Sequence, residues 1–115
     1  MTRPIAYLCA RPQRGAAEAE YVSFREAMKV DADGLDSWDL VRDALPADAL
    51  ERWSGFVVGG SPFNVTDPFT SKTEAQLRLE ADLERVAAAA AAQQTSALFT
   101  CFGIGIVTRM LGGTV

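Results

Sequence analysis

Cys101 is the residue in this sequence best placed to do chemistry, because a short β-favouring run meets a helical pattern there. Residues 97–100 form the run, and Gly112 and Gly113 end the helical pattern. The apolar residues at helical spacing are Ile104, Val107 and Leu111. A strand that turns sharply into a helix projects the side chain at the turn, as in a nucleophile elbow. The N–H groups that open such a helix favour an anion and a thiolate.

The alternative interpretation of Cys101 is structural. An isolated cysteine in an apolar segment is more often a small buried hydrophobic residue than a nucleophile. Gly103, two residues later, lets the first helical turn pack closely against its neighbours. A structural cysteine does not require that glycine, so Gly103 favours the nucleophile.

A second candidate feature is the glycine pair Gly59 and Gly60, which directly follows the apolar run 56–58. Glycines at the end of a buried strand leave backbone N–H groups accessible to a ligand. A tight turn into the loop 63–72 explains the same residues equally well. In parallel sheets ligands bind beyond the carboxyl ends of the strands, so the glycine pair and Cys101 are expected at one edge.

Composition limits the classes of function. The chain has 115 residues, enough for one small domain, and a net charge of −4 with 11 scattered basic residues. We therefore expect no nucleic-acid or membrane partner, and no apolar run reaches the length of a spanning helix. Two widely spaced cysteines indicate a reducing cytoplasm and no metal site or other cofactor. There is no histidine, so no Cys-His couple can be completed within these residues.

Strand and helix patterns alternate along the chain. Strands are expected at 5–9, 35–41, 56–58 and 97–100, and helices at 16–30, 46–53, 73–94 and after Cys101. The apolar helix faces are Ala17, Tyr21, Phe24 and Met28, then Leu79, Leu83, Val86 and Ala90. Thr73 and Gln76 resemble a capping box. The alternation predicts a three-layer αβα flavodoxin-like parallel sheet of strand order 2-1-3-4, with 35–41 at an edge.

Several segments together resemble a class I glutamine amidotransferase of the triad type, with a cysteine nucleophile. They are residues 57–62 (VVGGSP), 100–103 (TCFG) and 111–113 (LGG). The chain is similar to stand-alone members related to the amidotransferase part of GMP synthase. The resemblance covers nearly all of the chain but half of such a domain. It thus implies that residues 1–115 are the N-terminal portion of one amidotransferase-like domain. Such a chain is either truncated or a degenerate relative, and we favour truncation.

The resemblance implies a reaction and its residues. Cys101 would attack the side-chain amide of L-glutamine, and the ammonia released would pass to an acceptor on a synthetase partner. Gly59, Gly60 and Phe102 would form the oxyanion and substrate-binding part, through the N–H groups of Gly60 and Phe102. The family's general base, a histidine oriented by a glutamate, lies beyond residue 115, so this chain alone is expected to be inactive. Phe99 and Gly105 stand where the family often has glycine and glutamine.

Two other functions remain open. A DJ-1/PfpI-type protein also has a cysteine elbow, but it needs a carboxylate near the end of strand one. The chain has no acid between Cys9 and Glu18. The other alternative is a non-catalytic flavodoxin-like binding or interaction domain.

The sequence also bears on oligomerisation of the chain and on the roles of Cys9 and of polar loop residues. The open edge of strand 97–100 favours a homo-oligomer formed by edge pairing. Cys9 is expected in the core, and the isolated polar residues of the loops are expected to be turn formers. These are Asp39, Asn64 and Asp67.

Overall fold

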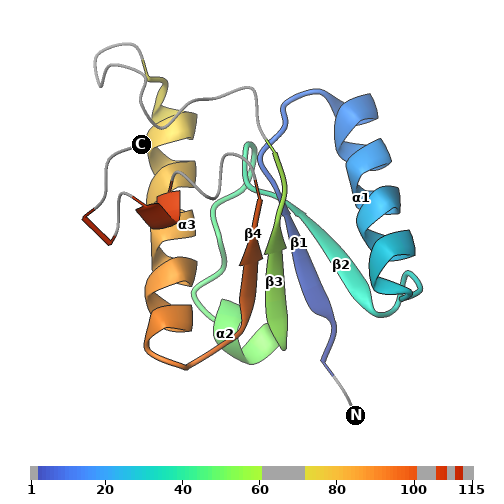
Figure 1. Ribbon diagram of the computed structural model, residues 1–115. Coiled ribbons are helices and arrows are strands. Elements are labelled where there is room, and N and C mark those ends of the chain that lie inside the picture. Colours follow the sequence, from blue (N-terminus) through green and yellow to red (C-terminus); the bar gives the residue numbers. More distant parts are fainter. Residues whose placement is uncertain (1–2, 61–71, 101–105, 109–110, 113–115) are drawn as a thin grey trace.

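Strands and helices alternate along the chain in the computed structural model, which describes residues 3–60, 72–100, 106–108 and 111–112 (Figure 1). The elements are β1 (Ile5–Cys9), α1 (Arg14–Met28), β2 (Leu35–Asp39), α2 (Ala49–Arg52), β3 (Gly55–Val58), α3 (Glu74–Ala91) and β4 (Ala97–Phe99). The predicted order of these elements is confirmed, β1 has the predicted bounds, and each of the other elements differs from the prediction by one to a few residues at one or both ends. The fold is therefore of the α/β class.

The four strands form one parallel sheet in the order β2-β1-β3-β4. This is the predicted order, and β2 lies at an edge as expected. Strand β4 lies at the other edge, and Val58 of β3 is in register with Phe99 of β4. Because all strands run the same way, their carboxyl ends meet at one edge of the sheet (Figure 1).

Strand β2 ends two residues earlier than predicted, and a turn at Asp39 is the reason. The Asp39 carboxylate accepts a hydrogen bond of 3.0 Å from the Val41 N–H, and the Asp39 carbonyl accepts one of 2.9 Å from the Asp43 N–H. The same carboxylate forms an ion pair with Arg42. These bonds turn the chain away from the sheet, and the prediction of Asp39 as a turn former is confirmed.

The helix ends follow local capping. Helix α1 ends two residues before the predicted position because Lys29 takes the left-handed conformation, with φ of 57°. Helix α3 begins after Thr73, whose hydroxyl accepts a 3.1 Å hydrogen bond from the Gln76 N–H. This bond is the Thr73 half of the predicted capping box. The helix ends at Ala91, before Gln93 with its φ of 62°.

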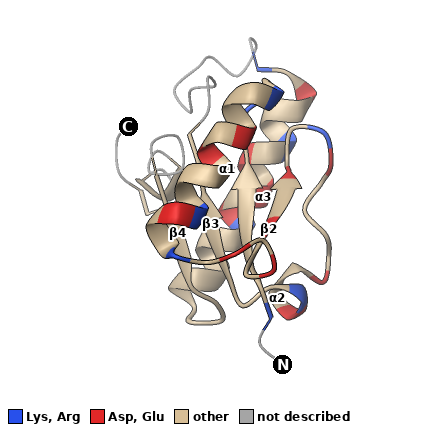
Figure 2. Ribbon diagram, turned by 90° about the vertical axis from the view of Figure 1, so that its right-hand side faces the viewer, with Lys and Arg blue, Asp and Glu red and all other residues tan. Residues whose placement is uncertain are grey.

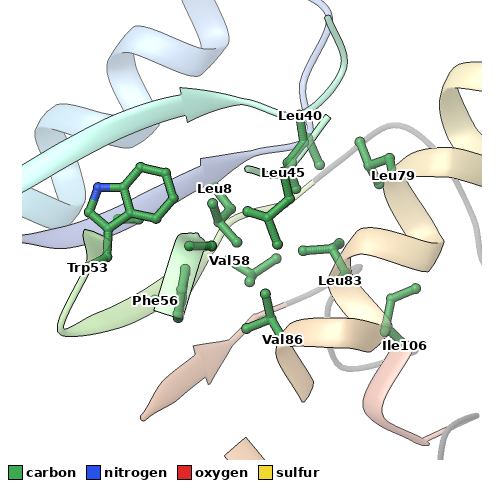
Figure 3. Close-up of a cluster of buried hydrophobic side chains, with 13 residues drawn as sticks. Leu8, Leu40, Leu45, Trp53, Phe56, Val58, Leu79, Leu83, Val86 and Ile106 are labelled. Atoms are coloured by element: carbon green, nitrogen blue, oxygen red, sulfur yellow. The ribbon is translucent and has the colours of Figure 1, made fainter. Parts of the chain in front are cut away.

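One face of the sheet packs against α2 and α3 and contains the larger apolar core. Its buried side chains include Leu8, Leu40, Leu45, Trp53, Phe56, Val58, Leu79, Leu83, Val86 and Ile106. Leu83 and Val86 point from α3 toward Val58 of the sheet (Figure 3). The predicted apolar face of α3 is therefore confirmed for Leu79, Leu83 and Val86. Each such side chain contributes about 1.5–3 kcal/mol when fully buried.

The opposite face of the sheet packs against α1. Tyr7, Cys9 and Leu35 are buried there, and the side chains that cover them from α1 are Ala17, Tyr21 and Phe24. This confirms the predicted apolar face of α1 for Ala17, Tyr21 and Phe24. Cys9 has 3% of its surface exposed and is a free thiol, so its prediction as a core residue is also confirmed.

The segment after Cys101 buries one described apolar residue and exposes another, while Ile104 lies outside the described residues. Residues 106–108 are helical, Ile106 is fully buried, and Leu111 is 71% exposed. Leu111 lies in a turn, where its N–H donates to the Val107 carbonyl at 3.0 Å, and Gly112 has φ of 84°. The turn carries Leu111 away from the core. The expected glycine stop is confirmed at Gly112.

Candidate functional site

The glycine pair lies at the carboxyl edge of the sheet, directly after β3. Gly59 and Gly60 are both buried. The segment that leads to Cys101 reaches the same edge. Thr100 donates to the Val58 carbonyl from its N–H at 3.2 Å and from its hydroxyl at 2.7 Å. Cys101, Phe102, Asn64 and Asp67 themselves lie outside the described residues.

The carboxylate of Glu20, on α1, accepts a hydrogen bond from the Gly60 N–H. The Gly60 nitrogen donates to Glu20 Oε2 at 2.9 Å, and Arg11 Nε lies 3.2 Å from the same oxygen. The Tyr7 hydroxyl donates to the other oxygen, Oε1. The Glu20 side chain is 17% exposed. Three donors from β1, the loop after it and the end of β3 therefore hold one partly buried carboxylate. We call these four residues the Glu20 cluster.

The glycines leave room for this close approach. A Cβ atom on Gly59 would lie 2.0 Å from Glu20 Oε1, and one on Gly60 would lie 2.5 Å from Arg11 Nη2. Both distances are far below van der Waals contact. The absence of side chains at 59 and 60 thus lets Glu20 and Arg11 lie against the backbone that follows β3.

Tyr7 acts in this cluster as a neutral donor. Burial, and next the hydrogen bond to Glu20, raise the pKa of the Tyr7 phenol well above its usual value. Its side chain is fully buried. The phenol therefore keeps its proton over the whole ordinary pH range and donates it to Glu20.

The Glu20 cluster is not predicted from the sequence, although the pattern of α1 contains a signal for it. Glu20 lies three residues after Ala17 and four before Phe24, so it is on the same face of α1 as the apolar residues that contact the sheet. An acid on an inward face needs partners. Acidic and basic residues are interspersed along α1 (Figure 2), so charge alone does not distinguish Glu20.

A second group of buried polar side chains lies in the first turns of α3. Lys72 Nζ is 2.8 Å from Glu80 Oε1, and the two side chains are 5% and 4% exposed. Gln76 Nε2 donates to Glu80 Oε2 at 3.0 Å. Because breaking a buried ion pair leaves an unpaired charge, this group holds Lys72, two residues before the start of α3, against the helix.

Across the described ranges, no three His, Cys, Asp or Glu side chains are grouped so that they could hold a metal ion. In the same ranges, no helix has both the length and the apolar character needed to span a bilayer.

Comparisons with protein-family models, with curated proteins and with solved structures found no match. The similarity to glutamine amidotransferases therefore stays a prediction from residues 57–62, 100–103 and 111–113. The geometry of the carboxyl edge is the further evidence that bears on function.

Proposed function

We propose that this chain carries the nucleophile and the oxyanion loop of a class I glutamine amidotransferase, on a flavodoxin-like sheet. The observation that carries the proposal is the bond between the Gly60 N–H and a carboxylate oxygen. It supports the view that the backbone after β3 offers a donor to an anion at the carboxyl edge. The register of β3 with β4 supports the same view, because Gly60 and Cys101 each follow the Val58–Phe99 pair by two residues.

In the proposed reaction, the Cys101 thiolate attacks the amide carbon of glutamine. The carbonyl oxygen becomes an oxyanion that the N–H groups of Gly60 and Phe102 stabilise, each by about 3 kcal/mol in the transition state. The carbon–nitrogen bond then breaks, ammonia leaves with an added proton, and a γ-glutamyl thioester remains on Cys101. Water hydrolyses the thioester to glutamate and regenerates the thiol. The ammonia passes to an acceptor on a synthetase partner.

The Glu20 cluster adds a condition to this reaction. Glu20 Oε2 already accepts from the Gly60 N–H, so a substrate oxyanion has to share that donor or displace the carboxylate. The histidine and glutamate that the resemblance assigns to proton transfer are not among these 115 residues. A test of the proposal therefore uses a reaction that needs only the thiol and the binding pocket.

The test is brief treatment with the diazo-ketone analogue of glutamine, followed by mass spectrometry of peptides. We expect labelling of Cys101 and none of Cys9, which is buried. Excess L-glutamine should protect Cys101, and the Cys101→Ser variant should take up no label. Equal labelling of both cysteines, or none, would contradict the proposal and favour a non-catalytic binding domain.

A DJ-1/PfpI-type function is the second candidate, and Glu20 is the observation that favours it. That type needs a carboxylate near the end of strand one, and Glu20 bonds to Tyr7 of β1 and to Gly60 after β3. The chain supplies it from α1 rather than from the loop after Cys9. Under this candidate, mild peroxide should convert Cys101 to a stable sulfinic acid. Sulfinic acid without diazo-ketone labelling would select this candidate over the amidotransferase.

A further inference from the structure

Arg11 and Glu20 form a charged pair directly over Gly60. Arg11 Nε and the Gly60 nitrogen both bond to Glu20 Oε2, at 3.2 and 2.9 Å. Arg11 Nη2 would stand 2.5 Å from a Cβ on Gly60, so the guanidinium lies against that glycine. The Arg11 guanidinium and the Glu20 carboxylate thus both lie next to the Gly60 N–H, which is the proposed oxyanion donor.

Arg11 is oriented for a further ligand. Within the described residues, the hydrogen bonds of its side chain use Nε alone. Glu20 fixes the guanidinium plane through that nitrogen and leaves Nη1 and Nη2 to donate elsewhere. Two parallel N–H groups of this kind bind a carboxylate in a bidentate manner. The Arg11 side chain is 31% exposed, so a small ligand can reach it.

Glu20 is suited to a cation on its other side. An ionised carboxylate has about four acceptor positions, and the Glu20 cluster uses three of them. Glu20 also lines an open groove of about 440 Å³ along α1, with Ser23, Phe24 and Ala27. A ligand ammonium entering there would find an acceptor. If the Gly60 N–H donated to a substrate oxygen instead of to Glu20, the carboxylate would lose one donor. The ligand ammonium would then replace that donor.

We propose that Arg11 and Glu20 recognise the α-carboxylate and the α-ammonium groups of an amino-acid substrate whose side-chain amide lies at Gly60. This inference rests on the proposed function, because it places the reacting amide at the Gly60 N–H. It adds which side chains of this chain would hold the two charged groups that a free amino acid has and an amide side chain within a peptide lacks.

The first experiment uses the unaltered chain and two forms of the diazo-ketone analogue, the free acid and its methyl ester. The ester keeps the reactive group and the ammonium but has no carboxylate. We expect Cys101 to be alkylated at least tenfold more slowly by the ester. Equal rates would overturn the role of Arg11 while leaving the proposed function intact. Absence of any Cys101 labelling by the free acid would overturn both.

The second experiment compares variants, with iodoacetamide as an uncharged reagent for the same thiol. Arg11→Gln should lower the diazo-ketone rate at least tenfold and change the iodoacetamide rate less than twofold. Arg11→Lys should give a diazo-ketone rate between those of the unaltered chain and Arg11→Gln, because an ammonium keeps the charge without the paired N–H groups. The matched control is Arg14→Gln, an exposed arginine at the start of α1, which should change neither rate. Equal loss with both reagents would show a general change at Cys101 and would overturn the inference.

Discussion

The Glu20 carboxylate and the Gly60 N–H are 40 residues apart in the chain and 2.9 Å apart in space. Their bond joins α1 to the backbone that follows β3, at the edge where parallel sheets bind ligands. The donor that the amidotransferase hypothesis assigns to a transition-state oxyanion therefore already faces an anion. Glu20 is thus central both to the stability of this edge and to any chemistry there.

Replacement of Glu20 by glutamine should lower the free energy of unfolding by about 1–3 kcal/mol, because a neutral amide has one oxygen to offer three donors. It also removes the ion pair with Arg11. Urea denaturation at neutral pH measures the change. Glu18→Gln is the matched control on the same helix. Glu18 is exposed, so its replacement should change the free energy by less than about 0.5 kcal/mol. Equal effects of the two substitutions would show that the Glu20 bonds contribute nothing.

Gly59→Ala should destabilise the chain by about as much as loss of the Glu20 bonds, 1–3 kcal/mol. The new Cβ would lie 2.0 Å from Glu20 Oε1 and would force the carboxylate out of its position. In a Glu20→Ala background the same substitution should cost much less, and a double-mutant cycle measures the difference. As a control, Gly15→Ala has open space around it in α1 and should stabilise by about 0.4–1 kcal/mol. Additive costs in the cycle would contradict the proposed clash.

Tyr7 should make the chain lose stability in alkaline solution. Burial and the bond to Glu20 raise the pKa of its phenol in the folded state above the ordinary value of 10.0. Below pH 10 both states hold the proton, and the contribution is fully present. Above pH 10 the unfolded phenol ionises while the folded one does not. The free energy of unfolding should then fall by about 1.4 kcal/mol per pH unit.

The Tyr7→Phe variant isolates this effect. It should be less stable than the unaltered chain by about 1 kcal/mol at neutral pH, because it lacks the hydrogen bond to Glu20. Its stability should decline less steeply above pH 10, so the two curves should converge. Denaturant titrations at several pH values test this. Parallel curves would mean that Tyr7 titrates alike in both states.

The architecture could be predicted from local pattern, since each element has a simple periodic cause. Leu79, Leu83 and Val86 repeat at helical spacing and are buried on the sheet. The apolar runs at Ile5–Cys9 and Gly55–Val58 are the two central strands. Alternation of such elements leads to a parallel sheet. The end of β2 could not be predicted in this way, because the Asp39 carboxylate bonds to the backbone after it.

The candidate site could be predicted only in part. Gly59 and Gly60 can be recognised as a candidate binding feature because glycines directly after a buried strand are a local signal. The Glu20 cluster depends on contacts between residues 7, 11, 20 and 60, which no single segment of the sequence contains. The position of Glu20 on the inward face of α1 indicates that it lies against the sheet but does not show what it contacts. Partners of that kind are determined by the packing of α1 on the sheet.

The last prediction concerns the segment after Cys101, where one apolar residue is buried and another is not. Ile106 is fully buried in the core shared with α3, so Ile106→Ala should lower the free energy of unfolding by about 2–5 kcal/mol. Leu111 is 71% exposed, so Leu111→Ala should change it by less than about 0.5 kcal/mol. Denaturant unfolding of both variants tests the contrast. A large loss at Leu111 with little at Ile106 would contradict the assignment of Ile106 to the core. The expected contrast between the two variants would show that Ile106 holds the segment following Cys101 on the α3 side of the sheet.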